Sequence, residues 1–255
     1  MEDKKKAEII ARLSELETEY QMRILLAVEG GSRAYGCASE NSDYDIRLIY
    51  VYPMERYLCL SSPADSIALQ EGKYDIHGWE LQRALLHASR SNATFWEWMK
   101  SRVLLNRQHF ATRLCDVANL YFSEKPMLYA QKEAIKSYRN KTVNGKMQAK
   151  HCLGVMRVAM QAVYMMQYHT APPIDIETLL NQTVLPGTQD AEECRKLLEL
   201  CRNGQKDTPY LLSCELAKNI EARMDQWLQT LSGNPQPDLS ALDKFFQAII
   251  LDRVE

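Results

Sequence analysis

Two short apolar runs near the amino terminus constrain the fold most, because each is bounded by a residue that breaks regular structure. The first, "MRILLAVEG", covers residues 22–30 and closes on glycine, and the second, "YDIRLIYVYP", covers residues 44–53 and closes on proline. A short apolar run flanked by such breakers is typical of a buried β-strand. We therefore expect the amino-terminal part of the chain to be built on a sheet.

The pattern along the rest of the chain predicts the fold class. Residues 66–79, "SIALQEGKYDIHGW", indicate a third and a fourth strand joined by a turn near Glu71 and Gly72, and from Glu80 onward the pattern is helical. The predicted class is α+β: a small mixed β-sheet domain with flanking helices at residues 1–105, followed by an all-helical domain at residues 106–255 that packs against it. The seam between two such units is a common place for a ligand cleft.

Composition narrows the class of protein. The formal net charge of −2 gives no global attraction to nucleic acid or to membranes, so any basic surface is local. The seven cysteines form no C-x-x-C pair, which disfavours a zinc ribbon or a disulfide framework and favours reduced thiols. No apolar stretch reaches the roughly 18 residues of a membrane span, and the charged first residues do not resemble a signal peptide. We expect a cytoplasmic protein with no membrane partner.

Two acids, Asp43 and Asp45, stand at the start of the second apolar run. Residues i and i+2 of an extended segment face the same side, so their carboxylates repel one another unless a cation lies between them. Mg²⁺ is such a cation, because it binds one or two carboxylates together with substrate phosphates. Two ions about 4 Å apart need a further acid from a neighbouring strand, and Asp75 is the candidate; Glu71 and Glu80 lie nearby as alternatives.

Simpler interpretations of the two acids stay open on the residues alone. The segment "ENSDYD" is rich in side chains that cap turns, so Asp43 suits a turn. Asp45 suits an ion pair with Arg47, which faces the same side two residues on. Arg47 itself is interpreted as a structural residue.

A glycine turn precedes the acids. Gly30 and Gly31 allow the backbone to approach a ligand closely, and Ser32 is placed to open a helical turn whose free N–H groups face that ligand. Free donors on one side and metal-binding acids on the other would make a clamp for a nucleoside triphosphate.

The string "GSRAYGCASENSDYDIR", with "YDIHGWELQRAL" and "FWEWMKS" after it, resembles the nucleotidyltransferase superfamily that includes DNA polymerase beta. Within that superfamily it is similar to the RNA-ligase-associated branch. The resemblance covers roughly residues 24–105 closely and the helical remainder loosely.

The resemblance implies roles for individual residues. Gly31 and Ser32 would bind the triphosphate, and Asp43 and Asp45 would bind metal, with Asp45 shared between two Mg²⁺ or Mn²⁺ ions. Asp75 would be the third acid, which helps to activate the attacking hydroxyl. The implied reaction moves a nucleoside monophosphate from a nucleoside triphosphate such as ATP to an acceptor hydroxyl or phosphate, and releases pyrophosphate. The association with RNA ligases implies an RNA end as acceptor, in RNA processing or repair.

Several basic residues are further candidates for phosphate binding. Arg33 follows the glycine turn and suits either a phosphate contact or a scaffolding ion pair. Residues 132–150 hold six basic residues and one acidic residue, which indicates either a solvated face or a patch that faces triphosphate or RNA. Within that patch Lys146 and Lys150 are predicted to bind nucleotide, and Arg157 further along is predicted to share one helical face with them.

Other side chains near the motif suit structural roles. Trp96 and Trp98 stand two residues apart, so we expect only one of them to be buried, and Glu97 between them suits an ion pair. The methionines from Met156 to Met166 suit the core of a buried helix.

A second function class competes with the enzyme. A nucleotide-binding regulator or antitoxin-like partner would keep the fold without turnover, and the same chemistry on a protein or small-molecule acceptor is a further alternative. The absence of a G-x-x-x-x-G-K-[ST] loop disfavours a P-loop kinase. The preferred base, the acceptor and the oligomeric state are left open by the sequence.

Overall fold

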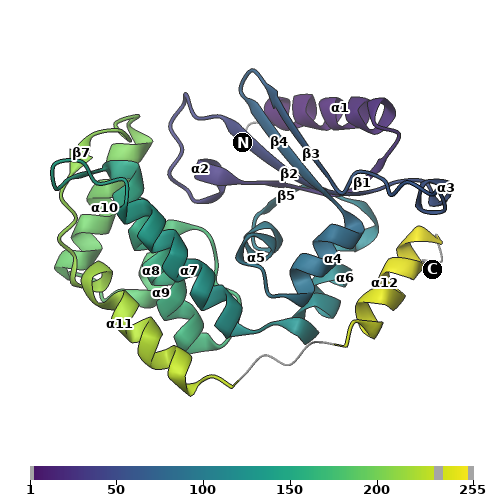
Figure 1. The fold of residues 1–255 in the computed structure, drawn as a ribbon. Helices are drawn as coiled ribbons and strands as arrows, with labels where there is room; N and C mark the ends of the chain where they lie inside the picture. Colours follow the sequence, from purple (N-terminus) through teal and green to yellow (C-terminus); the bar gives the residue numbers. More distant parts are fainter. Residues whose placement is uncertain (1–2, 233–237, 252–255) are drawn as a thin grey trace.

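The computed structural model of the protein describes residues 3–232 and 238–251. Its sheet has five strands in the order β3-β4-β2-β1-β5 (Figure 1). Strands β2 and β4 are parallel and the other neighbours are antiparallel, so the predicted mixed sheet is confirmed. The strands are β1 (Arg23–Glu29), β2 (Tyr44–Val51), β3 (Ser66–Glu71), β4 (Tyr74–Glu80) and β5 (Arg102–Asn106).

Strand β5 corrects the expectation of uninterrupted helix after Glu80. Only Leu104 of its five residues is buried, and its apolar run is just three residues long, from Val103 to Leu105, so the sequence marks it weakly. It forms because the edge of β1 offers unpaired backbone groups, and Ala27 pairs with Leu105 across that edge. A partner distant in sequence overrides the local pattern here.

Both faces of the sheet are covered. Helix α1 (Asp3–Glu19) lies on one face, and α4 (Leu81–Ser89), α5 (Ala93–Met99) and α6 (Phe110–Ala118) lie on the other (Figure 1). Alternate residues of β2 serve the two sides, since Leu48 packs in the cluster with α1 whereas Ile49 packs in the cluster with α4 and α5. This double burial explains why residues 48–51 of β2 form a continuous apolar run.

The second half of the chain is mainly helical, as predicted. Its main helices are α7 (Glu124–Arg139), α8 (Ala149–Tyr168), α9 (Ile176–Thr183), α10 (Gln189–Arg202), α11 (Glu215–Thr230) and α12 (Ser240–Ile250). Shorter elements are α2 (Gly31–Ala34), α3 (Met54–Tyr57), β6 (Met147–Gln148), β7 (Pro209–Tyr210) and two 3₁₀ turns, Arg107–His109 and Asn119–Tyr121.

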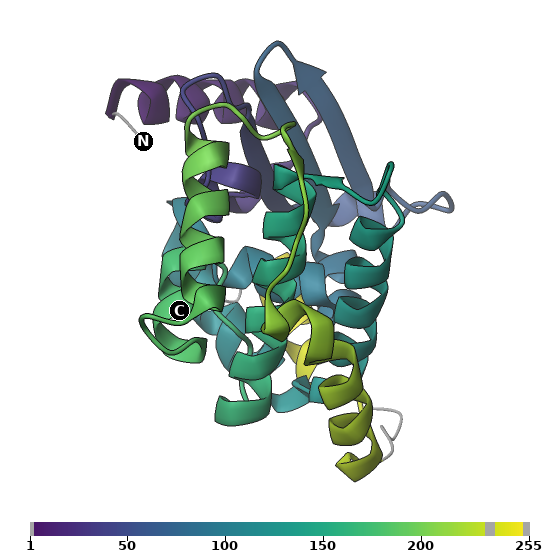
Figure 2. The same ribbon diagram turned by 90° about the vertical axis from the view of Figure 1, so that its left-hand side faces the viewer.

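Helix α8 is the centre of the helical part. It contacts α7, α9, α10 and α11, and Figure 2 shows α7, α8 and α10 side by side. Met156, Met160 and Met165 on α8 are fully buried, which confirms the predicted core role of these methionines.

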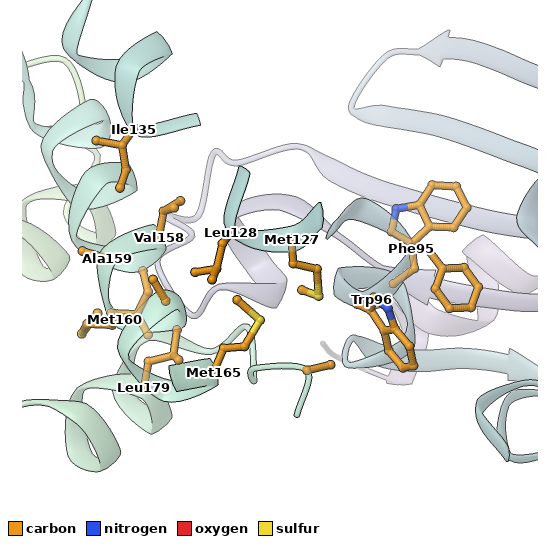
Figure 3. Close-up of a cluster of buried hydrophobic side chains, with 14 of the residues drawn as sticks. Phe95, Trp96, Met127, Leu128, Ile135, Val158, Ala159, Met160, Met165 and Leu179 are labelled. Carbon is orange, nitrogen blue, oxygen red and sulfur yellow. The ribbon is translucent and has the colours of Figure 1, made fainter. Parts of the chain in front are cut away.

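One hydrophobic cluster joins the helical part to the sheet. Figure 3 shows Phe95 and Trp96 of α5 next to Met127 and Leu128 of α7, with Met165 of α8 beyond them. Helix α12 returns to contact α4 and α6 beside the sheet (Figure 1). The boundary at residue 105 stays a prediction, and a shared core crosses it.

The expectation for the tryptophan pair was wrong. Trp96 is 2% exposed and Trp98 is 6% exposed, so both are buried. Trp98 stacks on Trp79 of β4 with ring centroids 3.7 Å apart, whereas Trp96 packs edge-on against Phe122. Both are buried because α5 is enclosed between the sheet and α7.

In the part of the chain that the structure describes, no helix has the length and apolar character needed to cross a membrane.

Candidate active site

The parallel pairing of β2 and β4 brings two of the predicted acids together. Asp45 lies directly opposite Asp75 in the register of these strands, and neighbouring strands are about 4.8 Å apart. The alternative third acids are engaged elsewhere. Glu71 accepts a 2.8 Å hydrogen bond from Arg12 Nε, and the buried Glu80 accepts a 2.6 Å bond from the Tyr57 hydroxyl.

Arg47 is the cation that lies between the two carboxylates. Its Nη2 donates to Asp45 Oδ1 at 2.7 Å and to Asp75 Oδ2 at 2.9 Å, while Nη1 donates to the Asp75 backbone carbonyl at 2.9 Å. The sequence interpretation of Arg47 as the ion-pair partner of Asp45 is thus confirmed. Its bridge to Asp75 was missed, because that contact depends on strand register.

The two glycines of the turn make room for this charged group. A Cβ on Gly30 would lie 3.1 Å from Cγ of Arg47, and one on Gly31 would lie 1.9 Å from Oδ2 of Asp45. Gly31 also has a positive φ of 60°, which favours glycine over other residues. The glycine turn and the acidic strand are therefore in direct contact, as a shared site requires.

The surroundings shift the pKa values of Asp45 and Asp75 in opposite directions. Burial raises the pKa of Asp45, and the positive charge of Arg47 offsets this only in part because Asp75 raises that pKa further. Burial alone would also raise the pKa of Asp75, but the hydrogen bond from Arg47 holds it below its ordinary value. Two carboxylates that share one site behave in this way. Asp75 is thus the more readily ionised of the two.

His77 adds a further contact to this pair. Its Nε2 lies 3.0 Å from Asp75 Oδ1, and its side chain is 49% exposed. A contact of this kind orients the carboxylate of Asp75 from the solvent side.

Asp43 does not join the other two acids in this structure. It is exposed in the loop before β2, and its carboxylate makes no hydrogen bond or ion pair with the described residues. Among residues 3–232 and 238–251, no three carboxylate, histidine or cysteine side chains are close enough to form a ready metal-binding group.

Arg33 holds the loop that carries Asp43. Its Nε donates to the Asp43 carbonyl at 3.1 Å and its Nη2 donates to the Ser42 carbonyl at 2.8 Å. The guanidinium also lies over the ring of Tyr44, 3.9 Å from the centroid. These contacts match the scaffolding alternative, and a phosphate contact by Arg33 stays a prediction. Ser32 is partly exposed within α2, next to Gly31.

Three of the six basic residues in segment 132–150 pair with acids elsewhere in the helical part. Lys132 pairs with Asp225 and Arg139 with Glu221. Lys150 pairs with Asp207 at 2.7 Å.

The predicted helical face of Lys146, Lys150 and Arg157 does not form. Lys146 precedes β6 and lies outside α8, which begins at Ala149. Arg157 is buried and pairs with Glu97 of α5 at 2.6 Å, so the ion pair expected for Glu97 is confirmed. The local sequence did not reveal that a two-residue strand would interrupt the helical pattern.

A cavity of about 320 Å³ lies at the seam between the sheet part and the helical part. Its walls include Tyr35, which follows α2, and side chains of α5, α7 and α8. The expectation of a cleft at this seam is therefore confirmed.

The model of a known protein family matches residues 6–248, and it is described as the RNA repair pathway DNA polymerase beta family. The chain belongs to this RNA repair pathway DNA polymerase beta family. The predicted resemblance to polymerase-beta-like nucleotidyltransferases is confirmed, and with it the prediction of an enzyme of the general nucleotidyltransferase class.

Two individual proteins are similar to this family member. The uncharacterized protein YcgL of Bacillus subtilis (strain 168) is 29% identical over 231 residues, which cover 88% of this chain and 84% of YcgL. The crystal structure of a nucleotidyltransferase-like protein from Exiguobacterium sibiricum 255-15 aligns with 98% of this chain and 81% of its own, at 15% identity and a TM-score of 0.28.

Proposed function

We propose that this protein is a metal-dependent nucleotidyltransferase that adds a nucleoside monophosphate to an RNA end. An oxygen of the acceptor attacks the α-phosphorus of a nucleoside triphosphate, the bond from that phosphorus to the bridging oxygen breaks, and pyrophosphate leaves. Where the acceptor is a hydroxyl, its proton passes to solvent. Membership of a family described by RNA repair supports RNA as the acceptor. The observation that carries the proposal is the Asp45–Asp75 pair, held face to face beside the glycine turn.

The side chains at the pair suit a divalent cation. Hard oxygen donors converge on one point there, and the guanidinium of Arg47 demonstrates that the pair holds a positive charge. Asp45 and Asp75 would hold Mg²⁺ or Mn²⁺, with Asp43 as a further ligand. The bound ions would neutralise the charge of the triphosphate.

The residues of the chain would position the reactants. Gly31 and Ser32 are proposed to contact the triphosphate through their backbone, because Gly31 lies against Asp45 without a side chain between them. Asp75, whose pKa is held low, would accept a hydrogen bond from an acceptor hydroxyl and orient it for attack.

The test incubates the full chain with each labelled nucleoside triphosphate, Mg²⁺ or Mn²⁺, and RNAs with defined 5′ and 3′ ends. We expect label on one kind of RNA end, with pyrophosphate release. Asp45→Ala should reduce the transfer by about 100-fold or more, as for loss of a group that stabilises developing charge. Glu71→Gln is the matched control, because Glu71 pairs with Arg12 away from the site.

The same test distinguishes the enzyme from the competing function class, a nucleotide-binding regulator. Tight nucleotide binding with no transfer to any RNA end, protein or small-molecule acceptor would reject the enzyme and favour a nucleotide-binding regulator. Transfer that survives Asp45→Ala would reject the site.

A further inference from the structure

The cavity at the seam has the size and lining of a small-molecule site. At about 320 Å³ it falls within the usual range of ligand pockets, about 300–1,000 Å³. Apolar and aromatic side chains make most of its wall, including Met127, Ala134 and Tyr138 of α7. The Tyr138 ring lies flat against Gly154 of α8, where a Cβ would be 2.7 Å from the ring. The wall is thus built by close packing of two helices.

A buried arginine contributes hydrogen-bond donors to the cavity. Arg157 is 6% exposed, lies 3.9 Å from the Tyr35 ring centroid and donates through Nη1 to Glu97 Oε1 at 2.6 Å. Nη1 also lies 3.4 Å from Gln161 Oε1. A guanidinium has five N–H donors, and Nε and Nη2 of Arg157 make no hydrogen bond with the described residues.

Two more polar atoms beside the cavity lack partners. Trp96 Nε1, a donor, and Gln131 Oε1, an acceptor, are buried without a hydrogen bond among the described residues. Their residues are only 2% and 4% exposed. A buried polar atom without a partner costs free energy, so each such atom calls for an explanation. Both atoms are covered, but Gln131 lines the cavity, so rotation of its amide would let a ligand's donor reach Oε1.

The charge of the cavity selects the class of ligand. Glu97 already balances Arg157, so the cavity does not offer a net positive charge to a phosphate group. A nucleobase is neutral, carries donors and acceptors along its edge and stacks on aromatic side chains.

The position of the cavity agrees with this class. The amide of Tyr35 donates to the Gly31 carbonyl at 3.0 Å, and Gly31 packs on Asp45. The backbone of Tyr35 is therefore one helical turn, about 5.4 Å, from the proposed triphosphate contact at Gly31.

We propose that this cavity binds a nucleobase, with Arg157 and Gln131 reading its edge and Tyr138 contacting its face. The inference rests on the proposed function and adds the residues that recognise the base. The base belongs either to the nucleoside triphosphate or to the terminal nucleotide of the RNA.

The experiment fills the cavity. Ala134→Phe places a ring in the space, and Ser137→Phe, an exposed position of the same helix that does not line the cavity, is the matched control. Affinities of the full chain are measured by calorimetry for the four nucleoside triphosphates, for inorganic tripolyphosphate with Mg²⁺, and for a short RNA. We expect Ala134→Phe to lower the affinity for the tightest-binding triphosphate about tenfold, as for loss of a stacked base. The affinity for tripolyphosphate should not change.

The affinities for triphosphates and for RNA distinguish the two possible sources of the base. A loss confined to nucleoside triphosphates supports the donor base, and a loss confined to RNA supports the acceptor base. Gln131→Leu, which keeps the side-chain volume, gives the same readout if Ala134→Phe does not fold. Unchanged affinity for both ligands in a folded variant would overturn the proposal while leaving transfer intact. Wild-type protein that binds neither triphosphates nor tripolyphosphate would instead reject the proposed function, and the nucleobase site with it.

Discussion

At the scale of single residues, the site depends on how Arg47 and two glycines arrange one pair of acids. The pairing of Arg47 with both Asp45 and Asp75 means that the chain itself supplies a cation to this pair. A divalent ion at the same carboxylates would have to displace that guanidinium. The internal cation and the metal are then competitors, which has measurable consequences.

Removing the guanidinium of Arg47 should change how much a divalent metal stabilises the protein. Arg47→Met leaves two facing carboxylates without a cation, so we expect a loss of about 1–3 kcal/mol of stability in the absence of metal. Mn²⁺ should then raise the melting temperature more in the variant than in the wild type. Thermal unfolding with and without Mn²⁺ measures both effects.

The control for this measurement is Arg107→Met. Arg107 pairs with Glu17 at 2.8 Å, apart from the acidic pair. Arg107→Met should lower stability without altering the rise in melting temperature that Mn²⁺ produces. An equal Mn²⁺ shift in Arg47→Met and wild type would show that Arg47 and the metal do not share the site.

A methyl group at Gly31 should disable the site. The added Cβ would lie 1.9 Å from Asp45 Oδ2 at a positive φ, so Asp45 must move. We expect Gly31→Ala to lower nucleotide transfer by at least about tenfold and to destabilise the fold by more than the roughly 1 kcal/mol of a positive-φ alanine alone. Transfer assays and denaturant unfolding measure the two effects.

Gly72→Ala is the control that separates backbone strain at a positive φ from displacement of Asp45. Gly72 has a φ of 58° and no atom within 4 Å of an added Cβ, so only the backbone cost applies there. If Gly31→Ala matched Gly72→Ala in both assays, the contact between Gly31 and Asp45 would have no functional weight.

At the scale of elements, α5 and α8 are joined by the ion pair of the partly exposed Glu97 and the buried Arg157. This pair connects a helix that lies on the sheet to the central helix of the helical part. Breaking one partner leaves the other charge buried without compensation.

We expect Glu97→Gln to cost about 3 kcal/mol of unfolding free energy, because Arg157 loses its counter-charge in a desolvated place. The double variant Glu97→Gln with Arg157→Met should recover part of that loss. Urea unfolding of the single and double variants measures the coupling. The exposed pair of Lys150 and Asp207 is the control, and Lys150→Met should cost no more than about 1 kcal/mol. Additive losses in the double variant would show that the two side chains are not coupled.

At the scale of the whole molecule, ligand binding should stabilise both parts together, because one hydrophobic cluster runs from the sheet into the helices. A non-hydrolysable nucleoside triphosphate with Mg²⁺ at about 100 times its Kd should add about 2.7 kcal/mol. The melting temperature should rise in a single transition. Asp45→Asn should abolish the rise. Two separate transitions, only one of which moves with ligand, would contradict a shared core.

Local sequence was enough for the elements that carry their own signal. The buried strands β1 and β2, the turn at Glu71 and Gly72, and the Met-rich core helix α8 were predictable because burial on both faces or at helical spacing leaves a pattern within a few residues. The long motif around Asp45 was likewise enough to indicate the family.

Other features depend on residues that meet only after folding. Strand β5 exists because the edge of β1 pairs with it, and Trp96 and Trp98 are both buried because α5 is covered from two sides. Arg157 is a buried ion-pair residue because folding brings α8 against Glu97 of α5. The register of β2 against β4 turned Arg47 into the bridge between Asp45 and Asp75, and no spacing along the chain encodes a contact between parallel strands.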